Sequence, residues 1–271
     1  MNSFEKEYYE AERFWEGDGL LDENNIDRFT KTMALIPGDV QSLADIGCGN
    51  GIFVNYLSQK MQNLNIIGID RSEAALKFVK TNKQLGDINA LSVSSHMYDC
   101  VTCLEVIEHL PENIFEKALN ELCRVSKKYV IISTPYNEIL EENYTKCPGC
   151  KSQFNADMHL RSFDIPRIQQ LLQKQGYSCV SYQTLGETVI YKGHYSFRKI
   201  FYPSQFKKWR SPICPICGYH AVQEQTDITN TGFTKQNTKS RSLISYLAVL
   251  PKLFWPKQKK YYWILALYQK Q

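Results

Sequence analysis

Apolar positions along the chain follow two spacings, one typical of helices and one typical of strands. Residues 26–36 place apolar side chains three to four positions apart before Pro37-Gly38, which predicts a helix that ends there. Short apolar runs predict strands at 42–44, 66–70, 98–104, 129–134, 177–185 and 261–268. Helical patterns lie between several of these strands, at 52–57, 73–80 and 164–175. This alternation predicts an α/β fold with a doubly wound sheet.

A glycine-rich turn follows the first predicted strand, in the sequence DIGCGNG at 45–51. Glycines have no Cβ, so a ligand can approach the backbone closely there. Asp70 ends the next strand, where a carboxylate can hold a ribose diol, so the pair predicts an adenosine-containing cofactor. Asp45 favours a cationic cofactor, because it would repel a pyrophosphate. Asp45 and the G-x-G-x-G spacing therefore disfavour a nicotinamide oxidoreductase.

This turn, together with GID at 68–70, GDINALSVSSHMYDCV at 86–101 and CLEVIEHL at 103–110, resembles the class I S-adenosylmethionine-dependent methyltransferases. The resemblance covers residues 40–185 and the last strand. It implies a Rossmann-like, seven-stranded sheet whose last strand is antiparallel, and S-adenosyl-L-methionine as cofactor. The residues it implies at the cofactor are Asp45, Gly47, Cys48, Gly49, Gly51, Asp70, Arg71, Asp87, Ile88 and Leu104.

The same resemblance sets the expected domain organisation. Residues 1–38 form an N-terminal helical cap, and residues 39–271 form the methyltransferase domain. The irregular stretch at about 187–259 is expected to be a basic insertion between the last two strands.

Four of the nine cysteines occur as two C-P-x-C pairs, Cys147 with Cys150 and Cys214 with Cys217. Four thiolates suit tetrahedral zinc, so the pairs predict a zinc site that joins two distant segments. Replacement of one cysteine ligand by His159 or His220 stays open. A thiol-exchange role is disfavoured, because two similar pairs are not needed for it.

A second candidate metal site lies in the CLEVIEHL stretch. Glu105, Glu108 and His109 would fall on one face of a helix, and their oxygen and nitrogen atoms suit magnesium or another divalent ion. This stretch and DMHLRSF at 157–163 resemble metal-dependent 2′-O-methyltransferases of small RNAs and ubiquinone-pathway O-methyltransferases, which implies that His159 completes the site. Similar stretches occur in methyltransferases without a known metal, so metal-free catalysis by Glu108, His109 and His159 stays open.

The charge distribution suggests an anionic partner. The net charge is +4, but residues 192–260 contain thirteen lysines and arginines against two acidic residues. The apolar and aromatic run at 242–255, followed by lysines, is too short to cross a bilayer and is a candidate for contact with an anionic membrane surface. A helix packed on the domain is the alternative for this run. No secretory signal is recognised, so a cytoplasmic protein is expected, with the membrane surface as a possible location.

These patterns predict O-methylation of a small-molecule, sugar or lipid-linked acceptor, with N- or C-methylation open. The alternatives are a methyltransferase acting on RNA, and a zinc-stabilised binding module with a vestigial cofactor fold. DNA is not an expected partner, and the acceptor and the oligomeric state are left undetermined.

Overall fold

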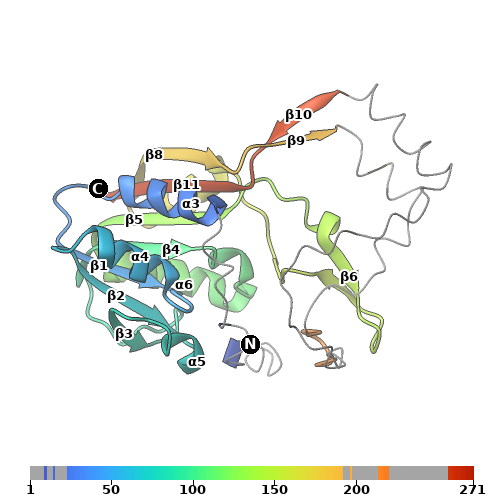
Figure 1. Cartoon of the computed structure of the whole chain (residues 1–271), viewed down its shortest axis with the longest axis horizontal. Helices are drawn as coiled ribbons and strands as arrows, with labels where there is room; N and C mark the ends of the chain where they lie inside the picture. Colours follow the sequence, from blue (N-terminus) through green and yellow to red (C-terminus); the bar gives the residue numbers. More distant parts are fainter. Residues whose placement is uncertain (1–8, 11–14, 16–22, 192–195, 197–212, 220–255) are drawn as a thin grey trace.

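The computed structural model describes residues 9–10, 15, 23–191, 196, 213–219 and 256–271 (Figure 1). Its main sheet has seven strands in the order β3-β2-β1-β4-β5-β11-β8, and β11 is antiparallel to both of its neighbours. The strands are β1 (Ser42–Ile46), β2 (Asn65–Asp70), β3 (Asn82–Leu85), β4 (Tyr98–Leu104), β5 (Ser126–Pro135), β8 (Tyr177–Leu185) and β11 (Trp263–Lys270). The predicted fold class, including the antiparallel last strand, is confirmed.

Helices cover both faces of this sheet. They are α3 (Glu23–Ala34), α4 (Ile52–Lys60), α5 (Glu73–Leu76), α6 (Glu112–Val125) and α7 (Ile165–Gln173), with 3-10 turns η2 (Ile107–His109) and η3 (Leu140–Asn143). One buried apolar cluster contains Leu122 of α6 and Ile168 of α7, and a second contains Phe29 of α3 and Phe53 of α4. Successive residues of β4 point into opposite clusters, as strand geometry requires, and the layers are therefore helix, sheet and helix.

Two local predictions differ from the structure. The helix predicted at 73–80 is the shorter α5, although Ser72 caps it as expected and accepts a bond from the Ala75 N–H. The Asn55 side chain bonds to the Phe78 carbonyl and the Lys80 N–H, which takes these backbone groups away from a longer helix. Strand β3 was not predicted, because its polar side chains are largely exposed at the sheet edge.

Two smaller antiparallel pairs lie beside the main sheet (Figure 1). One joins β6 (Tyr144–Lys146) to β7 (Gln153–Asn155), and the other joins β9 (Thr188–Tyr191) to β10 (Lys257–Lys260). The β9–β10 pair therefore lies at the two ends of the predicted insertion at 187–259. Most basic residues of the insertion, and the whole candidate membrane segment 242–255, lie outside the described residues. The domain boundaries stay predictions.

Candidate functional site

The glycine turn joins the end of β1 to α4 in a conformation that side chains disfavour. Gly47, Gly49 and Gly51 have φ values of 78°, 55° and 75°. A Cβ on Gly47 would lie 2.6 Å from the Val106 side chain, and one on Gly49 would lie 2.9 Å from the Trp15 ring. Glycine is therefore required at these positions by both backbone geometry and space.

Asp70 at the end of β2 is fixed against this turn. Its carboxylate accepts bonds from the Gly49 N–H at 2.8 Å and the Ser72 N–H at 2.9 Å. Burial raises the pKa of Asp70, which these two bonds only partly offset. A carboxylate has about four acceptor positions, so these two bonds orient it while leaving capacity for a ligand hydroxyl.

The other residues implied at the cofactor lie around these two elements. Gly86 donates its N–H to the Asp70 carbonyl, and this bond brings the following Asp87 and Ile88 beside the end of β2. Leu104 is half-buried at the end of β4, and Arg71 stacks on the Tyr9 ring. Direct contact of each with the cofactor stays a prediction.

Asp45 and Cys48 face the protein interior. The Asp45 carboxylate accepts a 2.6 Å bond from the Thr102 hydroxyl, and burial raises its pKa to about 7. Burial likewise raises the pKa of the Cys48 thiol. Asp45 is therefore linked to β4 by a hydrogen bond, and its predicted contact with a cationic cofactor stays a prediction.

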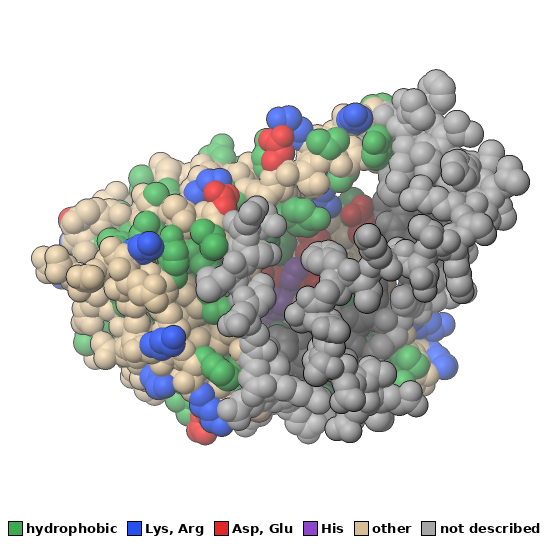
Figure 2. All heavy atoms as spheres, viewed as in Figure 1, with side chains coloured by type: hydrophobic (Ala, Val, Ile, Leu, Met, Phe, Trp, Pro, Cys, Tyr) green, Lys and Arg blue, Asp and Glu red, His purple; other side chains and the backbone are tan. Residues whose placement is uncertain are grey.

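A second group of polar side chains contains Glu108 and His109 from η2 and His159 from the stretch after β7. One ligand atom from each lies within 4.8 Å of the others, and the two imidazole rings are 4.9 Å apart. Figure 2 shows histidine and acidic side chains gathered in a hollow on this face. The segments are tied together, since the Leu160 N–H donates to the Glu108 carbonyl at 2.9 Å.

Glu105 does not belong to this group, and the predicted helical face through Glu105, Glu108 and His109 is wrong. Glu105 has φ 58°, outside the 3-10 turn, and its carboxylate accepts a 2.7 Å bond from Ser133 and pairs with Arg28 at 3.2 Å. The 3-10 turn is also short: Pro111 keeps Leu110 out of helical geometry, with ψ 128°, and α6 begins only at Glu112.

Two atoms of the group have no hydrogen-bond partner among the residues that the structure describes. Glu108 Oε2 accepts a bond from Thr134 at 3.1 Å, but Oε1 is buried with no hydrogen-bond partner, and the same is true of His109 Nδ1. Burial raises the pKa of Glu108, with Glu105 adding to the effect, and burial lowers the pKa of His109 to about 4, with His159 adding to it. Buried polar atoms are normally paired, so the arrangement fits a bound group that these atoms contact.

Glu138 and Asn155 support His159, and sequence reasoning identified neither of them. Glu138 Oε2 accepts a bond from His159 Nδ1 at 2.5 Å, and the Asn155 amide donates to Glu138 Oε1 at 3.2 Å. Burial alone would lower the pKa of His159, but the carboxylate outweighs it and the pKa is raised. No sequence motif predicts the contact between Glu138 and His159, because the two residues lie 21 positions apart.

Three strained backbone positions adjoin the same group. Glu105, Asn137 and Met158 all have positive φ, between 50° and 60°, and each lies within three residues of Glu108, Glu138 or His159. Such conformations cost roughly 1–3 kcal/mol each and concentrate at functional sites. The positive-φ residues therefore concentrate around the group that contains Glu108 and His159, and a functional role of this region stays a prediction.

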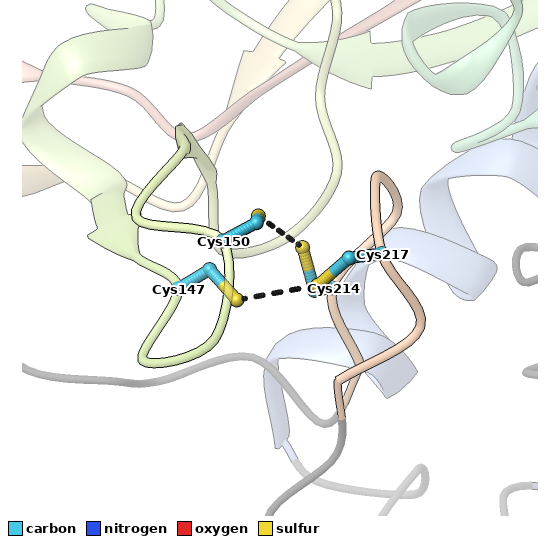
Figure 3. Close-up of side chains that lie close together, drawn as sticks. All are labelled: Cys147, Cys150, Cys214 and Cys217. Atoms are coloured by element: carbon cyan, nitrogen blue, oxygen red, sulfur yellow. Dashed lines mark hydrogen bonds between the residues drawn. The ribbon is translucent and has the colours of Figure 1, made fainter.

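The four predicted zinc ligands also come together. All four sulfur atoms lie within 4.8 Å of one another, with Cys147 and Cys150 on the β6–β7 loop and Cys214 and Cys217 on the segment 213–219 (Figure 3). His159 belongs to the other group, and His220 lies outside the described residues.

Comparisons with known proteins agree on the family. A family model described as a methyltransferase domain matches residues 20–182. The ubiquinone biosynthesis O-methyltransferase of Rickettsia bellii is 35% identical over 104 residues, covering 35% of this chain and 42% of that protein. The small RNA 2′-O-methyltransferase of Arabidopsis thaliana is 30% identical over 143 residues, covering 45% of this chain and 15% of that protein. The chain thus spans less than half the length of these relatives.

Solved structures share the fold. A putative methyltransferase from Bacillus halodurans matches with a TM-score of 0.53 at 14% identity, covering 90% of this chain and 99% of that one. A S-adenosylmethionine-dependent methyltransferase from Archaeoglobus fulgidus matches with a TM-score of 0.52 at 16% identity, covering 97% and 99%. The sheet topology and the glycine turn of this chain are those of the class I S-adenosylmethionine-dependent methyltransferases. The chain belongs to the methyltransferase-domain family whose model it matches.

Proposed function

We propose that this protein transfers a methyl group from S-adenosyl-L-methionine to a hydroxyl oxygen of a small-molecule, sugar or lipid-linked acceptor, assisted by a divalent cation. The observation that carries the proposal is the group Glu108, His109 and His159, with its unpartnered buried atoms, next to the glycine turn. Val106, two residues before Glu108, packs against Gly47 and makes the two sites adjacent.

The glycine turn and Asp70 would hold the cofactor. Backbone exposed by Gly47 and Gly49 would contact its methionine and ribose parts, and the oriented Asp70 carboxylate would accept the ribose hydroxyls. The bound cofactor supplies a methyl group that is already electrophilic. The protein therefore has to align the acceptor oxygen and remove its proton.

Glu108, His109 and His159 would hold the cation. Carboxylate oxygen and imidazole nitrogen are ligands for magnesium, manganese, zinc or iron. Glu108 Oε1 and His109 Nδ1, which have no hydrogen-bond partner among the described residues, are the atoms that a cation would contact, although the buried Glu108 must then be ionised. A cation there would position an acceptor hydroxyl and lower its pKa.

His159 is the better base if the metal-free alternative holds. Its Nδ1–H donates to Glu138, which leaves Nε2 to take the acceptor proton, and the carboxylate then stabilises the imidazolium. The low pKa of His109, about 4, makes that imidazole a weaker base. Glu138 therefore has the supporting role in this mechanism.

The four cysteines take no chemical step in this proposal. Zinc bound by four thiolates has a closed coordination shell, so it would be structural. We also propose an anionic or lipid-linked acceptor, supported by the basic composition of residues 192–260. Among the described residues no helix is long and apolar enough to cross a membrane, and the proposed surface contact does not require one.

RNA is the second candidate acceptor, supported by the match to the small RNA 2′-O-methyltransferase. Methyl-labelled cofactor incubated with the protein and fractionated cell extract separates the candidates. We expect label in an alkali-stable ether of a small, sugar-containing or organic-extractable molecule, and no loss of label after nuclease treatment.

The Glu108→Gln variant should abolish labelling, whereas His96→Ala, at a histidine beside Lys270 in another part of the domain, should not. Nuclease-sensitive label would move the assignment to RNA. Label on nitrogen or carbon, or full labelling by Glu108→Gln, would overturn the proposal.

A further inference from the structure

The two C-P-x-C segments form the same local structure twice. In each, the N–H of the first cysteine donates to the carbonyl five residues later, from Cys147 to Ser152 at 2.9 Å and from Cys214 to Tyr219 at 2.7 Å. In each, the residue four positions after the first cysteine has positive φ and donates its N–H back to that cysteine: Lys151 at 3.1 Å and Gly218 at 2.9 Å. Each segment is thus a tight turn that brings its two sulfurs to one side.

The sulfurs face one another across the two turns (Figure 3). Cys147 Sγ lies 3.7 Å from Cys217 Sγ, and Cys150 Sγ lies 3.8 Å from Cys214 Sγ. A disulfide needs about 2.05 Å, so neither pair is bonded. A tetrahedron with zinc–sulfur bonds of about 2.3 Å has sulfur–sulfur edges of about 3.8 Å. These two distances match the edges of a tetrathiolate metal site, and all four sulfurs lie within 4.8 Å of one another.

Contacts around the sulfurs suit a metal-bound thiolate. The Cys214 sulfur interacts with the backbone groups of Ile216 and Cys217, and the Cys150 sulfur interacts with Ser152. Tyr219 packs on Gly149, where a Cβ would lie 3.3 Å from its ring. Groups that polarise and orient ligand sulfurs, and a packing contact between the turns, are typical of structural zinc sites.

We propose that Cys147, Cys150, Cys214 and Cys217 bind one structural zinc ion, which clamps the β6–β7 hairpin to the segment 213–219. No β-ladder joins the two segments within the part of the chain that the structure describes, and zinc would join them through four bonds. Cys147 and Cys214 are fully buried whereas Cys150 and Cys217 are exposed, so the ion would sit near the surface with all four positions filled by protein.

A zinc ion at this position would also affect catalysis, provided that His159 has the role given to it in the proposed function. The hairpin that carries Cys147 and Cys150 at its turn has Asn155 at its base. The Asn155 amide donates to Glu138 and to the Leu140 carbonyl, and Glu138 receives the Nδ1–H of His159. Zinc would thus act on the reaction only through position, by holding the hairpin that fixes the support of His159.

Metal analysis of the intact chain, purified without chelator, tests the site itself. We expect about one zinc per chain, and cobalt substitution should give the intense visible absorption of tetrahedral thiolate coordination. Cys150→Ser and Cys217→Ser, at the two exposed ligands, should each weaken zinc retention against a competing chelator more than roughly tenfold. Cys179→Ser, a half-buried cysteine on β8 outside the group, should not change it.

Cys150→His provides a variant that separates ligation from folding. It keeps a zinc ligand, so it should retain zinc where Cys150→Ser loses it. Absence of zinc from the wild-type chain, zinc retained by Cys150→Ser with Cys217→Ser, or disulfides joining these four cysteines in the freshly purified protein would overturn the proposal.

Glu108→Gln should keep its zinc while losing activity, so failure of the zinc site and failure of the proposed reaction are distinguishable. Cys150→Ser that folds normally should lower kcat while S-adenosylmethionine binding is unchanged. An unchanged kcat in a zinc-free Cys150→Ser protein would overturn the positioning role.

Discussion

Glu138 and His159 share a 2.5 Å hydrogen bond between Oε2 and Nδ1, although they lie on separate segments before β6 and after β7. Burial alone would raise the pKa of Glu138, but this bond and the charge of His159 outweigh it, so the pKa is lowered. An ionised carboxylate holds the imidazole with Nδ1 as donor and leaves Nε2 for the acceptor or a cation.

The first prediction concerns this bond. Glu138→Gln keeps the size of the side chain but weakens its hold on His159, so kcat should fall roughly 10- to 100-fold. Cofactor affinity, measured by calorimetry, should not change. Glu142→Gln is the matched control, because the Glu142 carboxylate pairs with Lys260 at 3.4 Å, whereas the Glu138 carboxylate bonds to His159. Equal losses in both variants would show that Glu138 has no special role.

The second prediction separates Glu108 from Glu105. Activity should be lost in chelator and restored by a divalent cation, and Glu108→Gln should abolish the restoration. Glu105→Gln should leave the restoration in place, because its carboxylate contacts Ser133 and Arg28 instead. Activity assays across a cation titration check both. Full activity of the wild-type protein in chelator would leave Glu108, His109 and His159 as metal-free groups.

The third prediction concerns the cofactor. Asp70→Asn should weaken S-adenosylmethionine binding by about 1.5–3 kcal/mol, the usual value for a hydrogen bond to a charged group, as measured by calorimetry. Asp39→Asn, an exposed carboxylate paired with Lys128, should bind normally. Unchanged affinity in Asp70→Asn would remove Asp70 from the cofactor site.

The fourth prediction concerns pH and stability. Asp45 has a pKa of about 7 in the folded protein against an ordinary value of 3.8, so between these values the folded state binds more protons than the unfolded state. Stability from this group therefore falls as pH rises from about 4 to 7, by up to about 4 kcal/mol. Urea unfolding of the wild type and of Asp45→Asn, measured at pH 5 and at pH 8, checks this. The free energy of unfolding of Asp45→Asn, relative to that of the wild type, should be higher at pH 8 than at pH 5.

Asp99 provides a control of opposite sign. Burial tends to raise its pKa, but bonds from the Gln41 and Ser42 backbone N–H groups and the Ser42 hydroxyl outweigh it and lower the pKa. Its stabilisation is present above the unfolded pKa and is lost as pH falls through the folded one. Asp99→Asn should therefore lose relative stability at neutral pH. Failure of Asp45→Asn to gain relative stability between pH 5 and 8 would contradict the assignment for Asp45.

Local signals in the sequence were sufficient for the cofactor end of the sheet. The conformations of Gly47, Gly49 and Gly51 depend on neighbouring backbone, and Asp70 ends a strand with a clear apolar pattern. These features can be identified without knowing what packs against them. The same holds for the two C-P-x-C pairs, because each turn is closed by hydrogen bonds within six consecutive residues, 147–152 and 214–219.

Helical periodicity failed at Glu105, which lies before the short 3-10 turn η2 instead of in a helix with Glu108 and His109. Spacing of i, i+3 and i+4 assumes a continuous helix, but Pro111 keeps Leu110 extended and delays α6 to Glu112. The backbone before it is free to turn, and Glu105 adopts φ 58° and faces Arg28 of α3. Strand β3 was missed for a different reason, since an exposed edge strand has no apolar pattern.

By itself, then, the sequence determined the class of fold, the glycine turn and the four cysteines that are possible zinc ligands. Tertiary structure alone decided that Glu138 supports His159, that Glu105 pairs with Arg28, and that four sulfurs from two segments come together, two of their distances matching the edge of a zinc tetrahedron. The physical reason is that hydrogen bonds and ligand geometry depend on distances between side chains, and spacing along the chain fixes such distances only within one helix, strand or turn.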